Sequence, residues 1–439
     1  MRKRRRVLYV LHNHPARRPG GAEVYALELH TAMNESSEFE PVLLAHAETR
    51  VPRMTPFGAA GEDDPRQFLL YSENGHFDHF LGTSRDEAVH KRHFRRFLEA
   101  VRPDVVHFQH TLFLGYDTIR EVKETVPSAP IVYTLHDFLP ICHRNGQMVR
   151  TRADELCIAA SPRRCHECFP DISPTSFAQR ERFIKAHFEL VDVFIAPSEF
   201  LRQRYIEWGL PPEKILFEDY GRLFPADRRD DPADRPRTRL GFFGQVTRFK
   251  GLDVLLEAMK LLKQRDVPVH LWIHGANLEL AGHGYRRRIE TLHAETRGVV
   301  TIAGSYDRSE LPQLMAEIDW VVVPSIWWEN SPLVIQEALM HGRPVVCSDI
   351  GGMAEKVVHG MDGLHFPVGD PVALADTLER ALKTPGLWDA LRAGIPPVHS
   401  MDDHIRSLET EYRRLARRTA GNGGVTFQPH RPRVARLAR

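Results

Sequence analysis

An alternation of short apolar runs and amphipathic segments, repeated in both halves of the chain, constrains the fold more than any other feature. The runs of the first half are Val7–His12, Val42–His46, Val105–His110, Ile131–His136 and Val193–Ser198. The runs of the second half are Leu240–Gly244, His270–Gly275, Val300–Gly304, Trp320–Ser325 and Val345–Ser348. Segments of helical period, such as Glu23–Met33 and Arg85–Ala100, follow most of the first five runs. Buried strands alternating with helices predict a doubly wound α/β fold in each half.

The length of the chain and the composition between its halves indicate two domains joined by a linker. A chain of 439 residues exceeds what one hydrophobic core usually serves. Residues 222–238 are rich in proline, aspartate and arginine, a composition typical of an interdomain linker. We therefore predict an N-terminal domain at 1–221 and a C-terminal domain at 239–400. An amphipathic helix at 401–418 and a basic, disordered tail at 419–439 complete the predicted organisation.

Charge and hydropathy exclude two function classes and leave one alternative open. The formal net charge of +1 excludes a strongly basic nucleic-acid binder. No apolar run reaches the roughly 18 residues of a transmembrane helix, and no secretory signal peptide is visible, so we expect a cytoplasmic protein. Arginines gather at both ends of the chain, at Arg2, Arg4, Arg5, Arg6, Arg431, Arg433, Arg436 and Arg439. They either belong to solvated termini or attach the protein peripherally to the inner face of an anionic membrane. In the second case each basic residue contributes about 1 kcal/mol of binding free energy.

The segment around residue 330 combines the end of a strand with the start of a helix. Val321–Ser325 has the composition of a buried strand. Ser331 is suited to the N-cap of the following helix, and Pro332 to its first position, where a missing N–H costs nothing. The free amides of Leu333 and Val334 would then form an anion-binding site at the helix N-terminus.

Two carboxylates flank this predicted anion site. Glu329 precedes it in the loop, and Glu337 follows it inside the helix. A ligand with an anionic centre and hydroxyls on either side would suit the arrangement, and a sugar nucleotide is such a ligand. The alternative is a capped helix that carries two solvated glutamates.

The stretch from Pro324 through Ser348-Asp349-Ile350-Gly351-Gly352 to Asp362-Gly363 resembles the donor-binding half of the family 4 retaining glycosyltransferases. The resemblance extends from Gly20 to about Arg417. It implies the GT-B fold, in which two Rossmann-like domains face each other across a cleft. It also implies a nucleoside diphosphate sugar as donor, no metal for catalysis, and a C-terminal helix that crosses back to the first domain.

The resemblance implies roles for the residues around the predicted anion site. Glu337 would hold the ribose hydroxyls, and Glu329 the hydroxyls of the donor sugar. The remaining donor contacts would come from Asn330, Ser331 and the amides of Leu333 and Val334.

A second strand–loop–helix segment, Gly244–Asp253, resembles the family's binding site for the leaving diphosphate. Lys250 matches the family's lysine, whereas Gln245 stands where the family commonly has arginine. We expect Lys250 to bind the diphosphate and Arg248 to supply the charge that Gln245 lacks. The alternative for Lys250 is a solvated lysine at a helix start.

The N-terminal domain contributes a glycine loop and a strand-end histidine. Gly20 and Gly21 follow the first strand, where glycine permits positive φ and close backbone approach to the donor phosphates or the acceptor. The family resemblance implies that His136 contacts the transferred sugar, with Asp137 orienting it or binding acceptor hydroxyls. Other strand-end histidines compete for that role, namely His12, His107 and His110. The nucleotide base would lie at His274-Gly275 and Gly304-Ser305-Tyr306.

Four of the five cysteines lie in one insertion at 142–170, namely Cys142, Cys157, Cys165 and Cys168. Cys165 and Cys168 form a C-x2-C pair, and four thiols suit a structural zinc ion in a reducing compartment. Unligated reduced thiols and a redox cluster are the alternatives, and His143 and His166 are spare ligands. Cys347, in a later strand, is expected to be an ordinary small apolar residue.

These features predict a retaining glycosyltransferase that moves a hexose from a nucleoside diphosphate sugar to a hydroxyl. The acceptor would be a glycan, a lipid-linked or a small molecule, in the synthesis of surface polysaccharide or a glycoconjugate. Two alternatives stay open, a sugar-nucleotide epimerase of the same fold and a non-catalytic sugar-nucleotide-binding protein. The sequence leaves the sugar, the base and the acceptor undefined.

Overall fold

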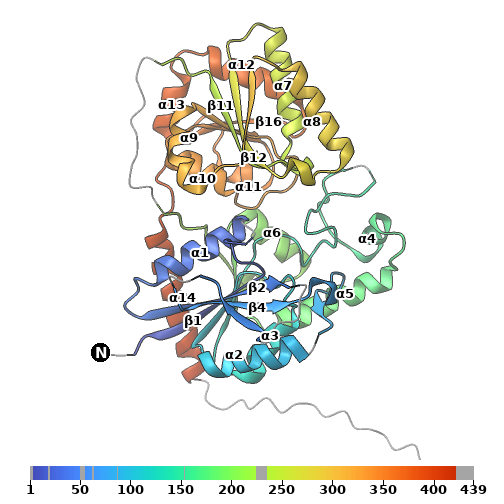
Figure 1. Ribbon diagram of the computed structural model, residues 1–439, viewed down its shortest axis with the longest axis vertical. Helices are drawn as coiled ribbons and strands as arrows, with labels where there is room; N and C mark the ends of the chain where they lie inside the picture. The colour runs from blue at the N-terminus through green and yellow to red at the C-terminus, as the bar shows by residue number, and fades with distance from the viewer. Residues whose placement is uncertain are drawn as a thin grey trace, which may run out of the picture.

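The chain folds into two α/β domains, and its C-terminal helix lies along the N-terminal domain (Figure 1). The computed structural model describes residues 3–17, 20–49, 55–61, 64–86, 88–152, 154–223 and 235–421. Residues 224–234 of the predicted linker and 422–439 of the predicted tail lie outside the described residues, as does Arg2.

The N-terminal sheet has eight strands in the order β10-β9-β8-β7-β1-β2-β4-β3, and all its pairings are parallel except that of β3 with β4. Its strands are β1 (Arg5–Leu11), β2 (Phe39–Glu48), β3 (Phe57–Ala59), β4 (Gln67–Ser72), β7 (Val105–Phe108), β8 (Ile131–Thr134), β9 (Val193–Ala196) and β10 (Ile215–Phe217). The five runs of the first half are confirmed as β1, β2, β7, β8 and β9. The order reverses between β1 and β7, so the loops after these strands meet at a switch point.

The C-terminal sheet is fully parallel, with the order β13-β12-β11-β14-β15-β16. Its strands are β11 (Arg239–Gln245), β12 (His270–Ala276), β13 (Val300–Gly304), β14 (Trp320–Val323), β15 (Val345–Ser348) and β16 (Gly363–Phe366). This is the order of a dinucleotide-binding fold, and its switch point lies between β11 and β14. Lys250 follows β11 and Glu329 follows β14, so the topology itself brings the two predicted donor segments together.

Helices cover both sheets, as the doubly wound prediction requires. They are α1 (Gly21–Met33), α2 (Phe94–Val101), α3 (Asp117–Thr125), α4 (Pro162–Cys168), α5 (Pro174–Phe188), α6 (Glu199–Trp208), α7 (Leu252–Gln264), α8 (His283–Glu295), α9 (Leu311–Glu317), α10 (Leu333–Met340), α11 (Gly351–Lys356), α12 (Pro371–Lys383), α13 (Leu387–Gly394) and α14 (Met401–Gly421). The helix predicted at Arg85–Ala100 is α2 preceded by a π-helical segment, Ala88–His93. None of the helices in the described ranges is both long and apolar enough to cross a bilayer.

Helix α14 is held to the N-terminal domain by buried contacts. Tyr412 is fully buried, and its hydroxyl lies 2.7 Å from Nδ1 of His107. The other ring nitrogen of His107 lies 2.7 Å from the hydroxyl of Thr134 at the end of β8. His107 is therefore a structural residue in the core, which removes it from the candidates for the site.

The N-terminal arginines that the structure describes bind the protein itself. Arg4 donates to the carbonyls of Asn34 and Ser36, at 3.1 and 2.9 Å. Arg5 lies 3.4 Å from Glu38, and Arg6 donates to the carbonyl of Val101 at 2.6 Å. These contacts tie the described N-terminal arginines to the N-terminal domain, so this end of the chain is not the freely solvated terminus of the first alternative.

Candidate active site

The loops after β8 and β14 meet between the two domains. The side-chain amide of Asn330 donates to the backbone carbonyl of His136 at 2.6 Å. The hydroxyl of Ser331 donates to Asp219 at 3.0 Å. Residues that the sequence placed on separate domains, His136 and the loop at 329–331, therefore occupy one interdomain site.

The predicted ligands Lys250 and Glu329 form an ion pair at the switch point of the C-terminal sheet. Nζ of Lys250 lies 2.6 Å from Oε1 of Glu329, whose side chain is buried. The same oxygen accepts hydrogen bonds from the hydroxyl of Ser325 at 2.8 Å and the indole of Trp327 at 2.9 Å. Three donors thus fix the carboxylate, while the Lys250 side chain stays 31% exposed and can reach a ligand.

Two glycines allow the segments of this pair to approach each other. Gly251 has φ +67°, and a Cβ there would lie 1.9 Å from the carbonyl oxygen of Pro324. A Cβ on Gly352 would lie 1.6 Å from the carbonyl oxygen of Asn330. The amide of Gly352 instead donates to the carbonyl of Glu329 at 2.7 Å. Any side chain at these positions would displace the loop that carries Glu329.

Helix α10 begins one residue later than the sequence predicted. Its N-cap is Pro332, with φ −65° and ψ 118°, and no side chain caps it. The prediction that Ser331 is the N-cap was wrong, because its hydroxyl bonds Asp219 across the domain boundary. The amides of Leu333 and Val334 still lie in the first turn of α10, where N–H groups have no acceptor within the helix.

The predicted ribose ligand Glu337 belongs to an interdomain cluster of four charges. Its Oε1 lies 2.8 Å from Arg222 and 2.9 Å from Arg308. Glu28, on α1, lies 2.9 Å from each of the same two arginines. No local pattern predicted this cluster, because its members are far apart along the chain. A nucleotide that binds Glu337 meets a carboxylate whose Oε1 is already paired with two arginines.

His136 lies at the interdomain site with both ring nitrogens engaged. Nδ1 lies 2.6 Å from the hydroxyl of Tyr220, and Nε2 lies 2.9 Å from Oε1 of Gln109. Burial, and then the nearby His110, lower the pKa of His136 to about 3. The imidazole is therefore neutral at physiological pH and can donate or accept a hydrogen bond but carries no charge.

A second polar cluster surrounds the loop after β1. His12 lies 2.9 Å from Glu23, and His110 lies 3.0 Å from Asp137. Burial is the largest single influence on Glu23 and raises its pKa, but the hydrogen bond to His12 and the nearby charges of His12 and His110 together leave the pKa lowered. The prediction that Asp137 orients His136 was wrong, because Asp137 pairs with His110 instead. His12 was one of the strand-end histidines that competed with His136 in the sequence analysis, whereas Glu23 was not predicted as a site residue, although its place at the start of the helix after β1 could have indicated it.

The predicted glycine loop begins helix α1 beside α10. Gly20 is the N-cap with φ −150°, an extended conformation, so it does not use the positive φ that glycine permits. A Cβ on Gly20 would lie 2.5 Å from the carboxylate of Glu23, and one on Gly21 would lie 3.8 Å from Leu333. Glycine is therefore needed at position 20 for the close approach of Glu23, whereas a Cβ on Gly21 would make only an ordinary contact with Leu333 of α10.

Arg248 reaches the cysteine-containing insertion. Its guanidinium lies 2.5 Å from Asp154, and the side chain is 55% exposed. Gln245, at the position where the family commonly has arginine, is also exposed. A diphosphate that binds Arg248 meets a guanidinium that already pairs with Asp154 through one nitrogen.

Aromatic side chains gather at the predicted base site. The rings of Phe243 and His274 stack, with centroids 4.9 Å apart and an interplanar angle of 14°. Tyr306 meets both rings edge-on, at 5.8 and 6.2 Å. Phe243 and His274 are buried, so this cluster packs the ends of β11 and β12 against the loop after β13.

The four cysteines of the insertion line one cavity of about 20 Å³, and His143 lines it as well. Burial raises the pKa of Cys142, and raises that of Cys165 to about 11. Among the described residues, the cysteines form no group of three whose sulfur atoms all lie within 4.8 Å of one another. The spare ligand His166 binds the carbonyl of Ile172 at 2.9 Å. The insertion contacts the donor loop, since the indole of Trp328 donates to the carbonyl of Cys157 at 3.2 Å.

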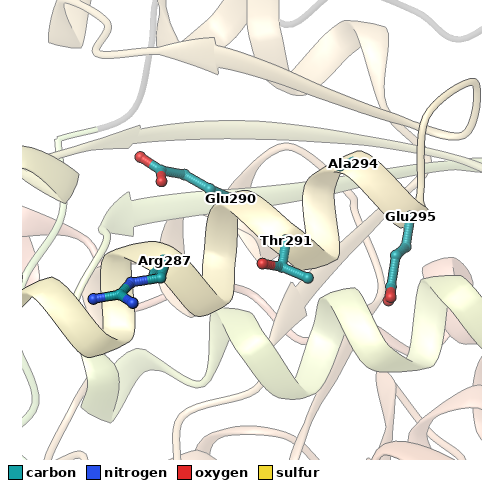
Figure 2. Close-up of a pocket in the computed structure, with 5 residues that line it drawn as sticks. All are labelled: Arg287, Glu290, Thr291, Ala294 and Glu295. Carbon is teal, nitrogen blue, oxygen red and sulfur yellow. The ribbon is translucent and has the colours of Figure 1, made fainter.

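A larger hollow lies far from this site on the outer face of α8. Figure 2 shows its lining side chains along that helix. They are Arg287, Glu290, Thr291, Ala294 and Glu295. The side chains of Arg287 and Glu290 do not converge on a common point, so the hollow has no features of a site.

Two families of known proteins match the chain, one in each domain. The family described as Glycosyltransferase Family 4 matches residues 19–216. The family described as Glycosyl transferases group 1 matches residues 237–384.

Individual relatives match shorter parts of the chain. A glycogen synthase of Alkalilimnicola ehrlichii is 30% identical over 207 residues, which are 44% of this chain and 40% of that protein. A D-inositol 3-phosphate glycosyltransferase of Jonesia denitrificans is 35% identical over 160 residues, 35% of this chain and 37% of that protein. The chain spans about two fifths of the length of these curated relatives.

Solved structures match the whole fold. Anabaena HepE, solved in complex with UDP and glucose, covers 93% of this chain over 100% of its own, with a TM-score of 0.63. Its sequence identity is 17%, so the likeness concerns the fold. It confirms the predicted GT-B arrangement of two Rossmann-like domains.

Proposed function

Because the chain belongs to the family 4, group 1 glycosyltransferases, we propose that it transfers a hexose from a nucleoside diphosphate sugar to a hydroxyl with retention of anomeric configuration. The ion pair of Lys250 and Glu329 carries the proposal. It sets a cation and a buried carboxylate 2.6 Å apart at the switch point of the C-terminal sheet, where parallel α/β sheets bind ligands. A donor binds there with its diphosphate toward Lys250 and its sugar hydroxyls toward Glu329.

The leaving diphosphate needs positive charge that is already in place when the glycosidic bond breaks. Lys250, Arg248 and the first amides of α10, those of Leu333 and Val334, supply it. Arg248 exchanges its contact with Asp154 for the phosphate. Glu337 takes the ribose hydroxyls in exchange for one of its two arginine contacts.

Transfer needs no carboxylate nucleophile in this arrangement. The bond between the anomeric carbon and the phosphate oxygen breaks, and the acceptor oxygen bonds the same carbon from the same face. The acceptor proton passes to the departing phosphate oxygen. Neutral His136 hydrogen-bonds the sugar, and the contact between Asn330 and the His136 carbonyl keeps the two domains together so that water is excluded.

The acceptor class is a hydroxyl of a glycan, a lipid-linked or a small molecule. The named relatives support this range, because one is a glycogen synthase and another acts on D-inositol 3-phosphate by name. We place the reaction in the synthesis of surface polysaccharide or a glycoconjugate in the cytoplasm. Peripheral contact with the inner face of an anionic membrane would use the terminal arginines, of which Arg4, Arg5 and Arg6 also bind groups of the protein itself.

Incubation with labelled UDP-, ADP- and GDP-hexoses separates this function from its two alternatives. The transferase consumes one donor only when an acceptor mixture is present, and releases the nucleoside diphosphate. Conversion of the sugar nucleotide without acceptor would identify an epimerase. Binding without any turnover would identify a non-catalytic protein.

A structural zinc ion on Cys142, Cys157, Cys165 and Cys168 is a further part of the proposal. The cavity that the four side chains share supports it. The ion would fix the insertion whose Cys157 carbonyl contacts Trp328, and so the edge of the site on the acceptor side.

A further inference from the structure

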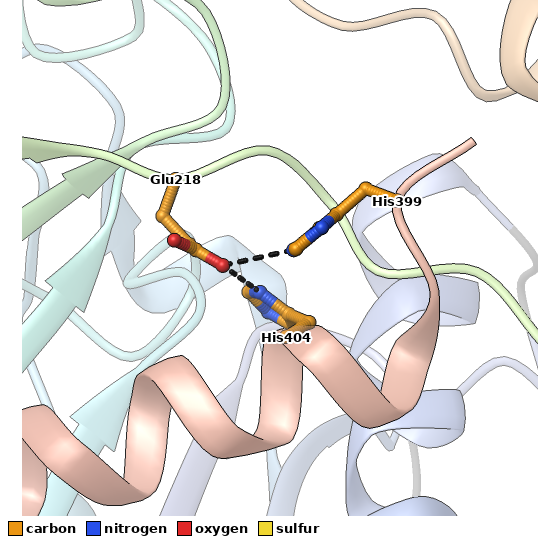
Figure 3. A group of neighbouring side chains, drawn as sticks. All are labelled: Glu218, His399 and His404. Atoms are coloured by element: carbon orange, nitrogen blue, oxygen red, sulfur yellow. Dashed lines mark hydrogen bonds and ion pairs between the residues drawn. The ribbon is translucent and has the colours of Figure 1, made fainter. Parts of the chain in front are cut away.

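Glu218, His399 and His404 converge where the chain passes between the domains (Figure 3). Glu218 follows β10, His399 precedes α14, and His404 lies in the first turns of α14. Both histidines point to the same carboxylate oxygen, Oε1 of Glu218. Nε2 of His399 and Nδ1 of His404 each lie 2.9 Å from it.

We propose that these three side chains bind a divalent transition-metal ion, with zinc as the natural occupant. Two imidazoles and one carboxylate are the ligand set of several zinc sites that keep a fourth position for water. Among the described residues, this is the one group whose potential ligand atoms all lie within 4.8 Å of one another. The inference does not depend on the proposed transfer reaction.

The distances require only small side-chain movements. Ligand atoms about 2.0–2.2 Å from a tetrahedral zinc ion are roughly 3.4 Å apart. The two contacts of 2.9 Å therefore open slightly, and the two histidine nitrogens, at most 4.8 Å apart, close toward the ion. The side chains of His399 and Glu218 are 30% and 21% exposed, which leaves access for the ion and a water ligand.

The surroundings of His404 supply the outer-shell bond that zinc-binding histidines usually have. His404 is fully buried, and its Nε2 lies 2.6 Å from the hydroxyl of Tyr25. A neutral His404 with its proton on Nε2 donates to Tyr25 and turns the lone pair of Nδ1 toward Glu218. A hydrogen-bond cluster without metal uses the opposite tautomer, so the two states are chemically distinct.

The ion would link the segment that leaves the N-terminal domain after β10 to the segment that returns to it at α14. The amide of Arg222 donates to the carbonyl of His399 at 3.1 Å, and the amide of Met401 donates to the carbonyl of Arg222 at 2.9 Å. The segment that leaves the N-terminal sheet and the one that returns to it therefore run side by side. Zinc bound to Glu218 and His404 ties the same two segments through their side chains.

Zinc titration after removal of metal by a chelator tests the proposal. The chain carries Cys165→Ser and Cys168→Ser throughout, so that the cysteine cavity cannot take the ion. Calorimetry should then find one zinc ion per chain, and zinc should raise the melting temperature. His399→Gln should abolish both effects, which are each measured against the metal-free form of the same variant.

Two further variants sharpen the result. Tyr25→Phe keeps all three ligands but removes the outer-shell bond, and should weaken zinc binding about 10–100-fold. His283→Gln, on the exposed start of α8, should change nothing. No zinc-dependent shift in the parent chain, or an equal shift in the His399→Gln chain, overturns the proposal and leaves a hydrogen-bond cluster only.

Discussion

The side-chain amide of Asn330 donates a 2.6 Å hydrogen bond to the backbone carbonyl of His136. This bond joins the loop after β14 in one domain to the loop after β8 in the other. It brings the carboxylate of Glu329 and the imidazole of His136 to the same site, although 193 residues separate them in sequence. The proposed chemistry depends on that juxtaposition, and the predictions below test its parts.

Glu337→Ala should weaken the binding of the bare nucleoside diphosphate by about 1.5–3 kcal/mol, the range for hydrogen bonds to a charged group. The reason is loss of the ribose contact. Isothermal calorimetry measures the change. Arg308→Met is the control, because it also breaks the charge cluster but keeps the carboxylate, and it should not weaken binding. An equal loss of nucleotide affinity in both variants would mean that Glu337 has a structural role only.

His136→Ala should reduce turnover at saturating donor on the order of 10²-fold, the effect of removing one hydrogen-bonding group that acts in the transition state. The affinity for the nucleoside diphosphate should change little, because His136 faces the sugar. Steady-state kinetics and calorimetry measure the two quantities. Tyr220→Phe removes a hydrogen-bonding partner of the His136 ring and should reduce turnover by less than His136→Ala does. If His136→Ala turned over at the wild-type rate, His136 would be a buried strand-end histidine with no role in transfer.

Acid should destabilise the protein partly through His136. The pKa of its imidazole is about 3 in the folded chain and about 6.5 when unfolded, so the unfolded state binds more protons between these values. Stability therefore falls as pH drops below about 6.5. From pH 7 to pH 5 the contribution is about 2 kcal/mol, at 1.36 kcal/mol per pKa unit. In urea unfolding, His136→Gln should lose about 2 kcal/mol less free energy of unfolding between pH 7 and pH 5 than wild type does. Identical pH profiles of stability for the two proteins would contradict a neutral buried imidazole.

Some of this site could be predicted from sequence and some could not. Runs such as Val321–Ser325 reveal buried strands, because both faces of a parallel sheet are covered and the run is uniformly apolar. β4 (Gln67–Ser72) and β16 (Gly363–Phe366) were missed, since their sequences mix polar residues with apolar ones. Local rules also failed at Ser331, where a tertiary bond to Asp219 replaces the cap that the pattern favours.

Interactions between segments far apart in the chain could not be predicted from a single sequence. Nothing near Glu337 indicated Arg222, and nothing near His136 indicated Tyr220. Both partners lie in residues 219–223, where the composition indicated only the end of the N-terminal domain and the start of a linker at 222. In the structure, this segment contacts both domains and so contributes to the site.

The cysteine cavity should hold one zinc ion per chain. Elemental analysis of wild type and of the Cys165→Ser/Cys168→Ser chain should differ by about one zinc, because each thiolate is a ligand. Cys347→Ala is the matched control, since that cysteine is buried in β15 away from the insertion, and it should retain the metal. Equal metal content in wild type and the double variant would leave unligated thiols as the correct description.

The configuration of the product tests the central claim most directly. The wild-type protein is incubated with a nucleoside diphosphate α-hexose and a panel of sugar and alkyl-glycoside acceptors, and the anomeric proton of the new glycoside is read by NMR. The account predicts an α-linked product formed by wild type and lost in Lys250→Met, since Lys250 binds the leaving diphosphate. A β-linked product, or unchanged transfer by Lys250→Met, would contradict it.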